Sequence, residues 1–208
     1  MDWRVVLVEE FSRGSRRVPD WNRPSRRIIA VSTRIARQRG WSVVVPYYHP
    51  SKRKRIYEKP RIAIIFDISG AISKSFYDTH IDDLNNCIRQ VKPEEVWVLY
   101  CDYEVRSVEH YEHPSITAIK PPEEIPPSKG LSAYTPAFRY IKEHGHEMRV
   151  ENIVYLTDLR PTEPLDSINR ELQTLFHQVE AKKLLWLVPS DVRDGDFWRP
   201  PLGKIVWI

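Results

Sequence analysis

The sequence predicts one α/β domain built on a doubly wound, Rossmann-like and mostly parallel sheet. A length of 208 residues with 41% hydrophobic residues suits one substantial core. Four short runs are almost entirely apolar, so a sheet that contains them must be covered by helices on both faces. These runs lie at residues 62–66, 96–100, 153–156 and 184–188. Segments with a helical spacing of apolar residues lie between them, which is the alternation of a doubly wound fold.

The first 60 residues differ in charge from the rest of the chain. They contain 15 Lys and Arg against 5 Asp and Glu, a net charge of +10, whereas residues 61–208 carry −6. Trp3, Trp21 and Trp41 lie in this segment and would be costly to leave in water. We therefore expect residues 1–60 to be a basic N-terminal extension, packed on the α/β domain of residues 61–208 as part of the same globule.

From residue 61 onward, the order of the elements follows from the pattern of apolar residues. The run RIAIIFD predicts the first strand, and an amphipathic helix over residues 73–91 follows it. The run EEVWVLYC predicts a second strand, EVRSVEHY an exposed strand, and PSITAI either the pairing partner or a neighbour of that exposed strand. Then come a helix in TPAFRYIKEHG, a strand in ENIVYLTD, a helix in LDSINRELQTLFHQVEA, and strands in KKLLWLV and GKIVWI.

Two of the predicted strands end in an aspartate, at the edge of the sheet where such folds bind their ligands. Asp67 ends RIAIIFD, and Asp158 ends IVYLTD. The loop SKGLSAYTP brings Ser132 and Thr135 just ahead of a helix. Carboxylate and hydroxyl oxygens that converge from separate loops are ligands that Mg²⁺ and Mn²⁺ accept. The sequence therefore predicts a divalent-cation site at this edge of the sheet.

These motifs resemble those of von Willebrand factor A (VWA) domains. FDISGAIS is similar to their Asp-x-Ser-x-Ser element, YLTD to their later strand ending in Thr-Asp, and the Ser132 loop to the one that carries a metal-binding threonine. The chain resembles in particular the C-terminal, VWA-like half of bacterial and archaeal metallopeptidase-like proteins of unknown function. The resemblance implies a VWA-like fold and a metal-ion-dependent adhesion-type site. Its ligands would be Asp67, Ser69, Ser132 and Asp158, with Thr135 as a further candidate.

The chain departs from the VWA pattern at three positions. Ala71 stands where the last residue of the first element should carry a hydroxyl, and Ser132, or alternatively Thr135, replaces the threonine. Leu159 replaces the glycine that often follows Thr-Asp. With one oxygen ligand missing, two states stay open: a degenerate site that binds Mg²⁺ or Mn²⁺ weakly, or a retired site in which Asp67 caps the following helix.

The expected function is that of a protein-interaction module rather than an enzyme. The sequence contains no His-Glu-x-x-His motif, no Gly-rich phosphate loop and no identifiable histidine partner for Cys101. The resemblance implies an adaptor role, with a MoxR-type AAA ATPase as the kind of partner. Two alternatives remain open: nucleic-acid binding through the basic N-terminal segment, and service as the accessory half of a metallopeptidase-like hydrolase.

The expected location is the cytoplasm. Two cysteines are too few for a disulfide framework, which indicates a reducing compartment. The N-terminus MDWRVVLVEEFSRGSRR carries charge where a signal peptide would be apolar, and no apolar run reaches the length of a membrane span. We therefore expect no membrane partner.

Overall fold

The computed structural model describes residues 2–12, 15–19, 25–40, 53–57, 59–70, 72–112, 114, 117–120, 132–179, 181–193 and 195–208. The chain divides into two compact units. Met1–Arg13 and Lys59–Ile208 form the larger unit, and Gly14–Glu58 form the second unit. The prediction that the whole of residues 1–60 packs on the α/β domain stays a prediction for residues 14–58.

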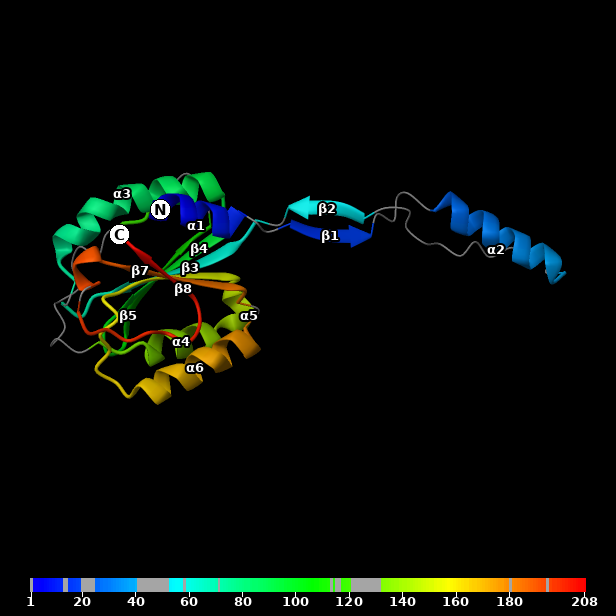
Figure 1. The fold of residues 1–208 in the computed structure, drawn as a ribbon. Coiled ribbons are helices and arrows are strands. Elements are labelled where there is room, and N and C mark those ends of the chain that lie inside the picture. The colour runs from blue at the N-terminus through cyan, green and yellow to red at the C-terminus, as the bar shows by residue number, and fades with distance from the viewer. Residues whose placement is uncertain are drawn as a thin grey trace. The chain divides into compact units, whose positions relative to one another are not determined.

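A six-stranded sheet forms the centre of the larger unit (Figure 1). Its strands in spatial order are β5 (Val105–Tyr111), β4 (Glu95–Cys101), β3 (Arg61–Asp67), β6 (Asn152–Leu156), β7 (Lys183–Val188) and β8 (Lys204–Trp207). Neighbouring strands pair in parallel, except that β5 runs antiparallel to β4. The predicted Rossmann-like, mostly parallel sheet is confirmed, and the four apolar runs are the adjacent strands β4, β3, β6 and β7.

Helices cover both faces of the sheet (Figure 1). One face carries α1 (Trp3–Ser12) and α3 (Lys74–Val91), and the other carries α4 (Thr135–Glu143) and α6 (Leu165–Gln178). Because side chains alternate along a strand, Ile62 and Ile64 of β3 pack with α1 and α3, whereas Ala63 and Ile65 pack with α4 and α6. Because helices cover both faces of the sheet, side chains on both sides of a central strand are buried, so the strand needs a continuous apolar run.

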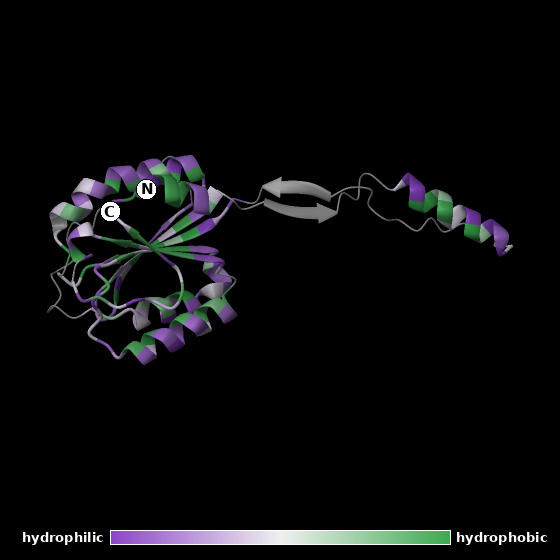
Figure 2. Ribbon diagram, in the orientation of Figure 1, coloured by the Kyte–Doolittle hydropathy of each residue, from purple (hydrophilic) through white to green (hydrophobic). Residues whose placement is uncertain are grey.

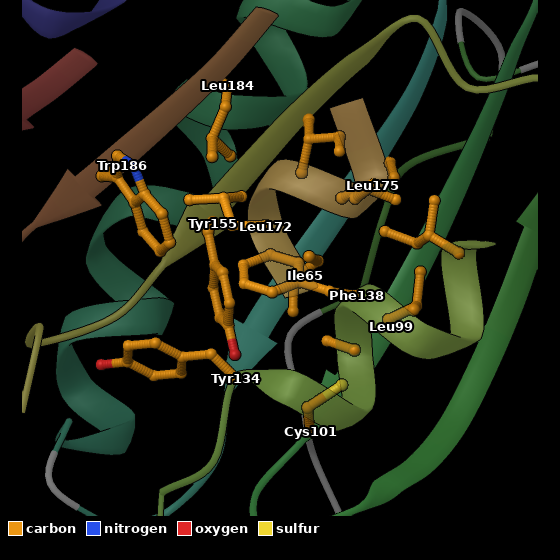
Figure 3. Packing of buried hydrophobic residues seen from close by; sticks show 14 of the residues in the cluster. Ile65, Leu99, Cys101, Tyr134, Phe138, Tyr155, Leu172, Leu175, Leu184 and Trp186 are labelled. Carbon is orange, nitrogen blue, oxygen red and sulfur yellow. The ribbon is translucent and has the colours of Figure 1, made fainter. Parts of the chain in front are cut away.

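Aromatic side chains fill the core on the α4 and α6 face, as Figure 3 shows. Tyr155 of β6 stacks on Trp186 of β7, with ring centroids 5.3 Å apart. Phe138 of α4 meets the same tyrosine edge to face, and Tyr134, just before α4, does so at 5.0 Å. This packing fixes the start of α4 against β6, which positions the loop that leads into the candidate site.

The helix α1 was not predicted from the sequence. Trp3, Val6, Leu7 and Phe11 are buried against the sheet and α3, at the spacing of one helical face. Near the end of α1, the Lys183 ammonium donates to the Glu10 carbonyl and lies 3.4 Å from the Glu10 carboxylate. Residues 2–12 are thus an integral part of the larger unit.

The second unit contains a pair of strands and a helix. β1 (Ser15–Pro19) pairs antiparallel with β2 (Arg53–Tyr57), and the helix α2 (Arg26–Gln38) lies between them in sequence. The Ser25 hydroxyl caps α2 by accepting a hydrogen bond from the Ile28 N–H at 3.5 Å. Trp21 and Trp41 lie outside the described residues, so their predicted burial stays a prediction.

The described part of PSITAI, Pro114 and residues 117–119, forms no strand, contrary to the prediction. The Asn85 side chain of α3 holds this segment instead. Its amide donates to the Ile119 carbonyl at 3.0 Å and accepts from the Ile119 N–H at 2.8 Å. Two short elements complete the larger unit, α5 (Gly145–Met148) and the 3-10 turn η1 (Ser190–Val192). Among the residues described, no helix is both long enough and apolar enough to cross a bilayer.

Candidate functional site

The candidate site lies at the carboxyl ends of β3 and β6. The strand order places these two parallel strands side by side at the centre of the sheet, where the chain moves outward in opposite directions from β3. This switch point is where doubly wound sheets bind their ligands. We call Asp67, Ser69, Ser132 and Thr157 the Asp67 site, because the last three residues all donate a hydrogen bond to the Asp67 carboxylate.

Asp67 is buried and is surrounded by hydrogen-bond donors. Its Oδ2 atom accepts from the Ser132 hydroxyl at 2.8 Å and from the Thr157 hydroxyl at 2.9 Å. Its Oδ1 atom accepts from the Ser69 N–H at 3.0 Å. The backbone carbonyl of Asp67 accepts from the Tyr77 hydroxyl of α3. The carboxylate is therefore fixed by donors from three separate segments of the chain.

Burial dominates the electrostatics of Asp67. It raises the pKa of this carboxyl above the ordinary 3.8, because the charged form loses contact with water, while the donors from Ser69, Ser132 and Thr157 lower it. The charges of Asp67 and Asp158 both raise the pKa of the Tyr77 hydroxyl, after the larger effect of burial. The charges of both carboxylates therefore reach the Tyr77 hydroxyl. The residue that donates a hydrogen bond to Asp67 from this part of the chain is Thr157.

Asp158 and Leu159 form a tight turn just beyond β6. The Asp158 Oδ1 atom accepts from the Arg160 N–H at 3.1 Å. Leu159 has φ +56°, a left-handed conformation that side chains other than glycine seldom adopt. Its side chain is fully buried in the core with α4 and α6. The backbone thus keeps a conformation suited to glycine, while leucine burial offsets its cost.

The loop that follows this turn holds the Ser132 segment in place. The Ser132 carbonyl accepts from the N–H and the hydroxyl of Thr162, at 2.8 and 2.9 Å. The Glu163 carboxylate accepts from the N–H groups of Tyr134 and Thr135 at the start of α4. An anion there satisfies helix N–H groups that lack an intrahelical partner and complements the helix dipole.

Two of the predicted ligands contact Asp67 directly. The Ser69 N–H and the Ser132 hydroxyl both donate to its carboxylate, and the role of these residues as metal ligands stays a prediction. Asp158 is buried next to Thr157, and its carboxylate is engaged by a backbone N–H. Thr135 is buried at the start of α4, where its N–H donates to Glu163. Ala71 lies outside the described residues.

Sequence reasoning missed Thr157 as a part of the Asp67 site, and Glu163 as the residue that holds the start of α4. Thr157 stands directly before Asp158 in YLTD, so the signal for it was present in the motif. Glu163 carried no comparable signal, because only the fold brings it to the start of α4, 28 residues away from Thr135 in the chain.

The oxygens of the Asp67 site fit a hard divalent cation. A hydroxyl that donates to Asp67 keeps lone pairs with which it can face a metal. The hydroxyl oxygens of Ser69 and Thr135 are buried without a hydrogen-bond partner. Among the described residues, no group of three or more His, Cys, Asp or Glu could hold a metal. A cation here would depend on hydroxyl oxygens and water besides its carboxylates.

The polar groups at the end of β4 do not form a nucleophilic centre. The Cys101 thiol is buried, and burial, followed by the charges of Asp67 and Asp102, raises its pKa well above the usual value. A thiol in that state is a poor nucleophile. The Asp102 carboxylate accepts from Arg106 at 2.9 Å and from the Glu104 N–H at 3.0 Å. These contacts shape the β4–β5 turn.

Comparison with known proteins gives a likeness in fold. No protein-family model and no curated protein matches the chain. Among solved structures, the chain is similar to the ArnB paralog VWA2 from Sulfolobus acidocaldarius, with a TM-score of 0.46 and 14% sequence identity. The likeness covers 64% of this chain and 35% of that chain, so this chain corresponds to about a third of that protein.

Proposed function

We propose that this chain is a protein-interaction module that docks its partner at the carboxyl edge of the six-stranded sheet, around the Asp67 site. The observation that carries the proposal is the convergence of one buried carboxylate with hydroxyls from separate loops at the switch point of the sheet. The likeness of FDISGAIS and YLTD to the motifs of VWA domains agrees with this use of the edge.

Exposed apolar side chains on neighbouring loops support a docking role. Tyr103 follows β4 and is 43% exposed, and Leu165 begins α6 and is 45% exposed. The Arg106 guanidinium lies over the Tyr103 ring at 4.5 Å, which holds the ring in one orientation. An edge with ordered apolar residues and a polar centre is the composition of a specific interface.

A divalent cation would extend this site. Asp67, Ser69, Ser132 and Asp158 would hold Mg²⁺ or Mn²⁺, with Thr135 as a further candidate. Bound there, the ion would supply an open coordination position for a carboxylate of the partner. The hydroxyl missing at Ala71 makes weak binding the expected outcome. The chain's own residues keep the Asp67 carboxylate oriented in either case.

The partner we propose is a protein, with a MoxR-type AAA ATPase as the class that the VWA resemblance implies. We propose no catalytic role, since the buried Cys101 thiol is held protonated and the sequence offers no histidine partner for it. The accessory role to a metallopeptidase-like hydrolase remains the alternative. It predicts that hydrolysis by the assembled protein is lost with Asp67→Ala or Asp158→Ala.

Calorimetric titration with Mg²⁺ tests the cation. Wild type should bind weakly, Ala71→Ser more tightly because it restores a hydroxyl ligand, and Asp67→Ala not at all. Absence of heat in all three proteins would mean that the site is retired.

Comparative enrichment of partners from the native cell tests docking separately. Tyr103→Ser/Leu165→Ser alters the proposed edge, whereas Val5→Ser alters a similarly exposed residue on α1. The proposal expects one set of proteins that the α1 variant retains and the edge variant loses. Equal retention by both variants would contradict docking at this edge.

A further inference from the structure

The helix α2 of the second unit exposes part of its apolar face. Val31 is 51% exposed and Ile35 is 43% exposed, and Ile28 and Ile29 are half-buried. On a helical projection, Ile28, Val31 and Ile35 lie on one side. Figure 2 shows hydrophobic and hydrophilic residues alternating along α2. An apolar stripe that remains this exposed is a candidate contact surface.

Basic residues surround this stripe. Arg26, Arg27, Arg34 and Arg37 are all exposed. At 100° per residue, Arg26 and Arg37 lie opposite the stripe, whereas Arg27 and Arg34 flank it next to Val31. Residues 25–40 contain no Asp or Glu that could neutralise them. The helix therefore combines an exposed apolar stripe with cationic residues opposite the stripe and along one of its flanks.

The positive charge extends beyond the helix. The second unit, Gly14–Glu58, holds 12 Lys and Arg against two Asp and Glu, a net charge of +10. Its strands contribute Arg16, Arg17, Arg53, Lys54 and Arg55. The larger unit carries −6, which completes the chain's +4. Charge on the helix and on both strands calls for an extended anionic surface rather than a single acidic pocket.

From these observations we infer that α2 binds in the plane of an anionic lipid surface. Its 13 residues span about 20 Å, so the helix lies flat with Val31 and Ile35 in the acyl boundary and the arginines among the headgroups. A nucleic acid would neutralise the arginines but leave the apolar stripe in water. Lipid accounts for both faces. The inference departs from the expectation of no membrane partner, which considered spanning segments only.

Vesicle binding by the full chain tests this inference. Sedimentation with phosphatidylcholine vesicles, with and without phosphatidylserine, should give binding only where the anionic lipid is present, and added salt should weaken it. Arg34→Gln/Arg37→Gln should weaken binding about 30-fold, and Val31→Ser/Ile35→Ser at least roughly tenfold. Serine has a helix propensity close to that of Val and Ile, so the second change leaves α2 intact.

Two comparisons make the test decisive. Arg89→Gln/Arg170→Gln removes the same charge from exposed positions of the larger unit, and it should bind vesicles like wild type. Binding that is unchanged in the Val31→Ser/Ile35→Ser protein, or equal on neutral vesicles, would overturn the inference. Wild type and the Val31→Ser/Ile35→Ser protein should then both be titrated with a single-stranded oligonucleotide. Tight, salt-dependent binding that is indifferent to Val31 and Ile35 would assign the basic unit to nucleic acid.

Discussion

Asp67 depends on hydroxyl and amide donors to remain in a buried position. Ser132 and Thr157 both donate to one carboxylate oxygen, and the Ser69 N–H donates to the other. Charge-assisted hydrogen bonds of this kind are worth about 1.5–3 kcal/mol each, yet they do not fully offset the loss of hydration, since the pKa of Asp67 remains raised. A carboxylate in this state favours either a proton or a cation.

The pH dependence of stability should reveal this state of Asp67. Because its folded pKa lies above its unfolded value near 3.8, the group favours folding at low pH. That contribution is lost as the pH rises through the folded pKa. We therefore expect metal-free wild type to lose stability relative to Asp67→Asn as the pH rises from 3.8 toward neutrality. Urea unfolding with a chelator present measures the difference, and a wild type that gains stability relative to Asp67→Asn as the pH rises would contradict the pKa direction.

Leu159 lets backbone strain be measured directly. Its φ of +56° favours glycine, while its buried side chain favours leucine. Leu159→Ala should lose about 2–5 kcal/mol of stability and keep the strain. Leu159→Gly removes slightly more side chain and relieves the strain, so it should be about 1 kcal/mol more stable than the alanine protein. Thermal unfolding of the two variants decides this, and a less stable glycine protein would mean that the turn is not strained.

At the scale of elements, the Asp67 site depends on two residues that support it indirectly. Thr162 positions Ser132, and Glu163 holds the start of α4. The first turn of α4 has no side-chain cap of its own, and Pro136 removes one N–H from it. The loop after β6 therefore supports the loop before α4, although the two loops are distant in sequence.

Replacing Glu163 should weaken this support. Glu163→Ala leaves two N–H groups at the start of α4 without their acceptor and should cost about 1–2 kcal/mol of stability. Glu163→Gln keeps an acceptor and loses only the charge, at a cost of about 0.3–1 kcal/mol. Chemical denaturation ranks the two, and amide exchange at Tyr134 and Thr135 should rise in the alanine protein. Equal stability of wild type and Glu163→Ala would show that water replaces the cap.

The elements readable from the sequence were those whose burial requires a continuous pattern. Strands β3, β4, β6 and β7 carry side chains covered on both faces, so their composition alone indicated them. The spacing of Trp3, Val6, Leu7 and Phe11 indicated α1 equally well, but Arg4, Glu9 and Glu10 made the segment look like a charged terminus. The contacts of Thr157 and Glu163 depend on which strands are neighbours, and local patterns do not encode that.

At the scale of the molecule, charge and core are distributed differently along the chain. The +10 of the N-terminal region belongs to the second unit, Gly14–Glu58, whereas residues 2–12 before it supply four side chains to the core of the larger unit. The helix α1 thus completes the core of the larger unit. In the sequence, the 45 residues of the second unit separate α1 from the rest of the larger unit. Its stability should therefore depend on α1 and not on the segment that follows it.

Two deletions separate these contributions. The Glu10 carbonyl contacts the Lys183 ammonium, and the register partner of Lys183, Asn152, pairs with Ile62. Two strand spacings and the reach of one lysine side chain therefore separate the end of α1 from the start of β3, roughly 16 Å at most. A Gly/Ser linker of about six residues in place of residues 14–58 can span that distance and should leave a folded protein with cooperative thermal unfolding.

Removing residues 2–12 instead takes away Trp3, Val6, Leu7 and Phe11, whose burial contributes roughly 6–12 kcal/mol. That loss rivals the 5–15 kcal/mol by which whole domains are stable, so circular dichroism should show an unfolded or aggregated chain. A folded protein without α1, or an unfolded one without residues 14–58, would reverse the roles assigned to the two segments.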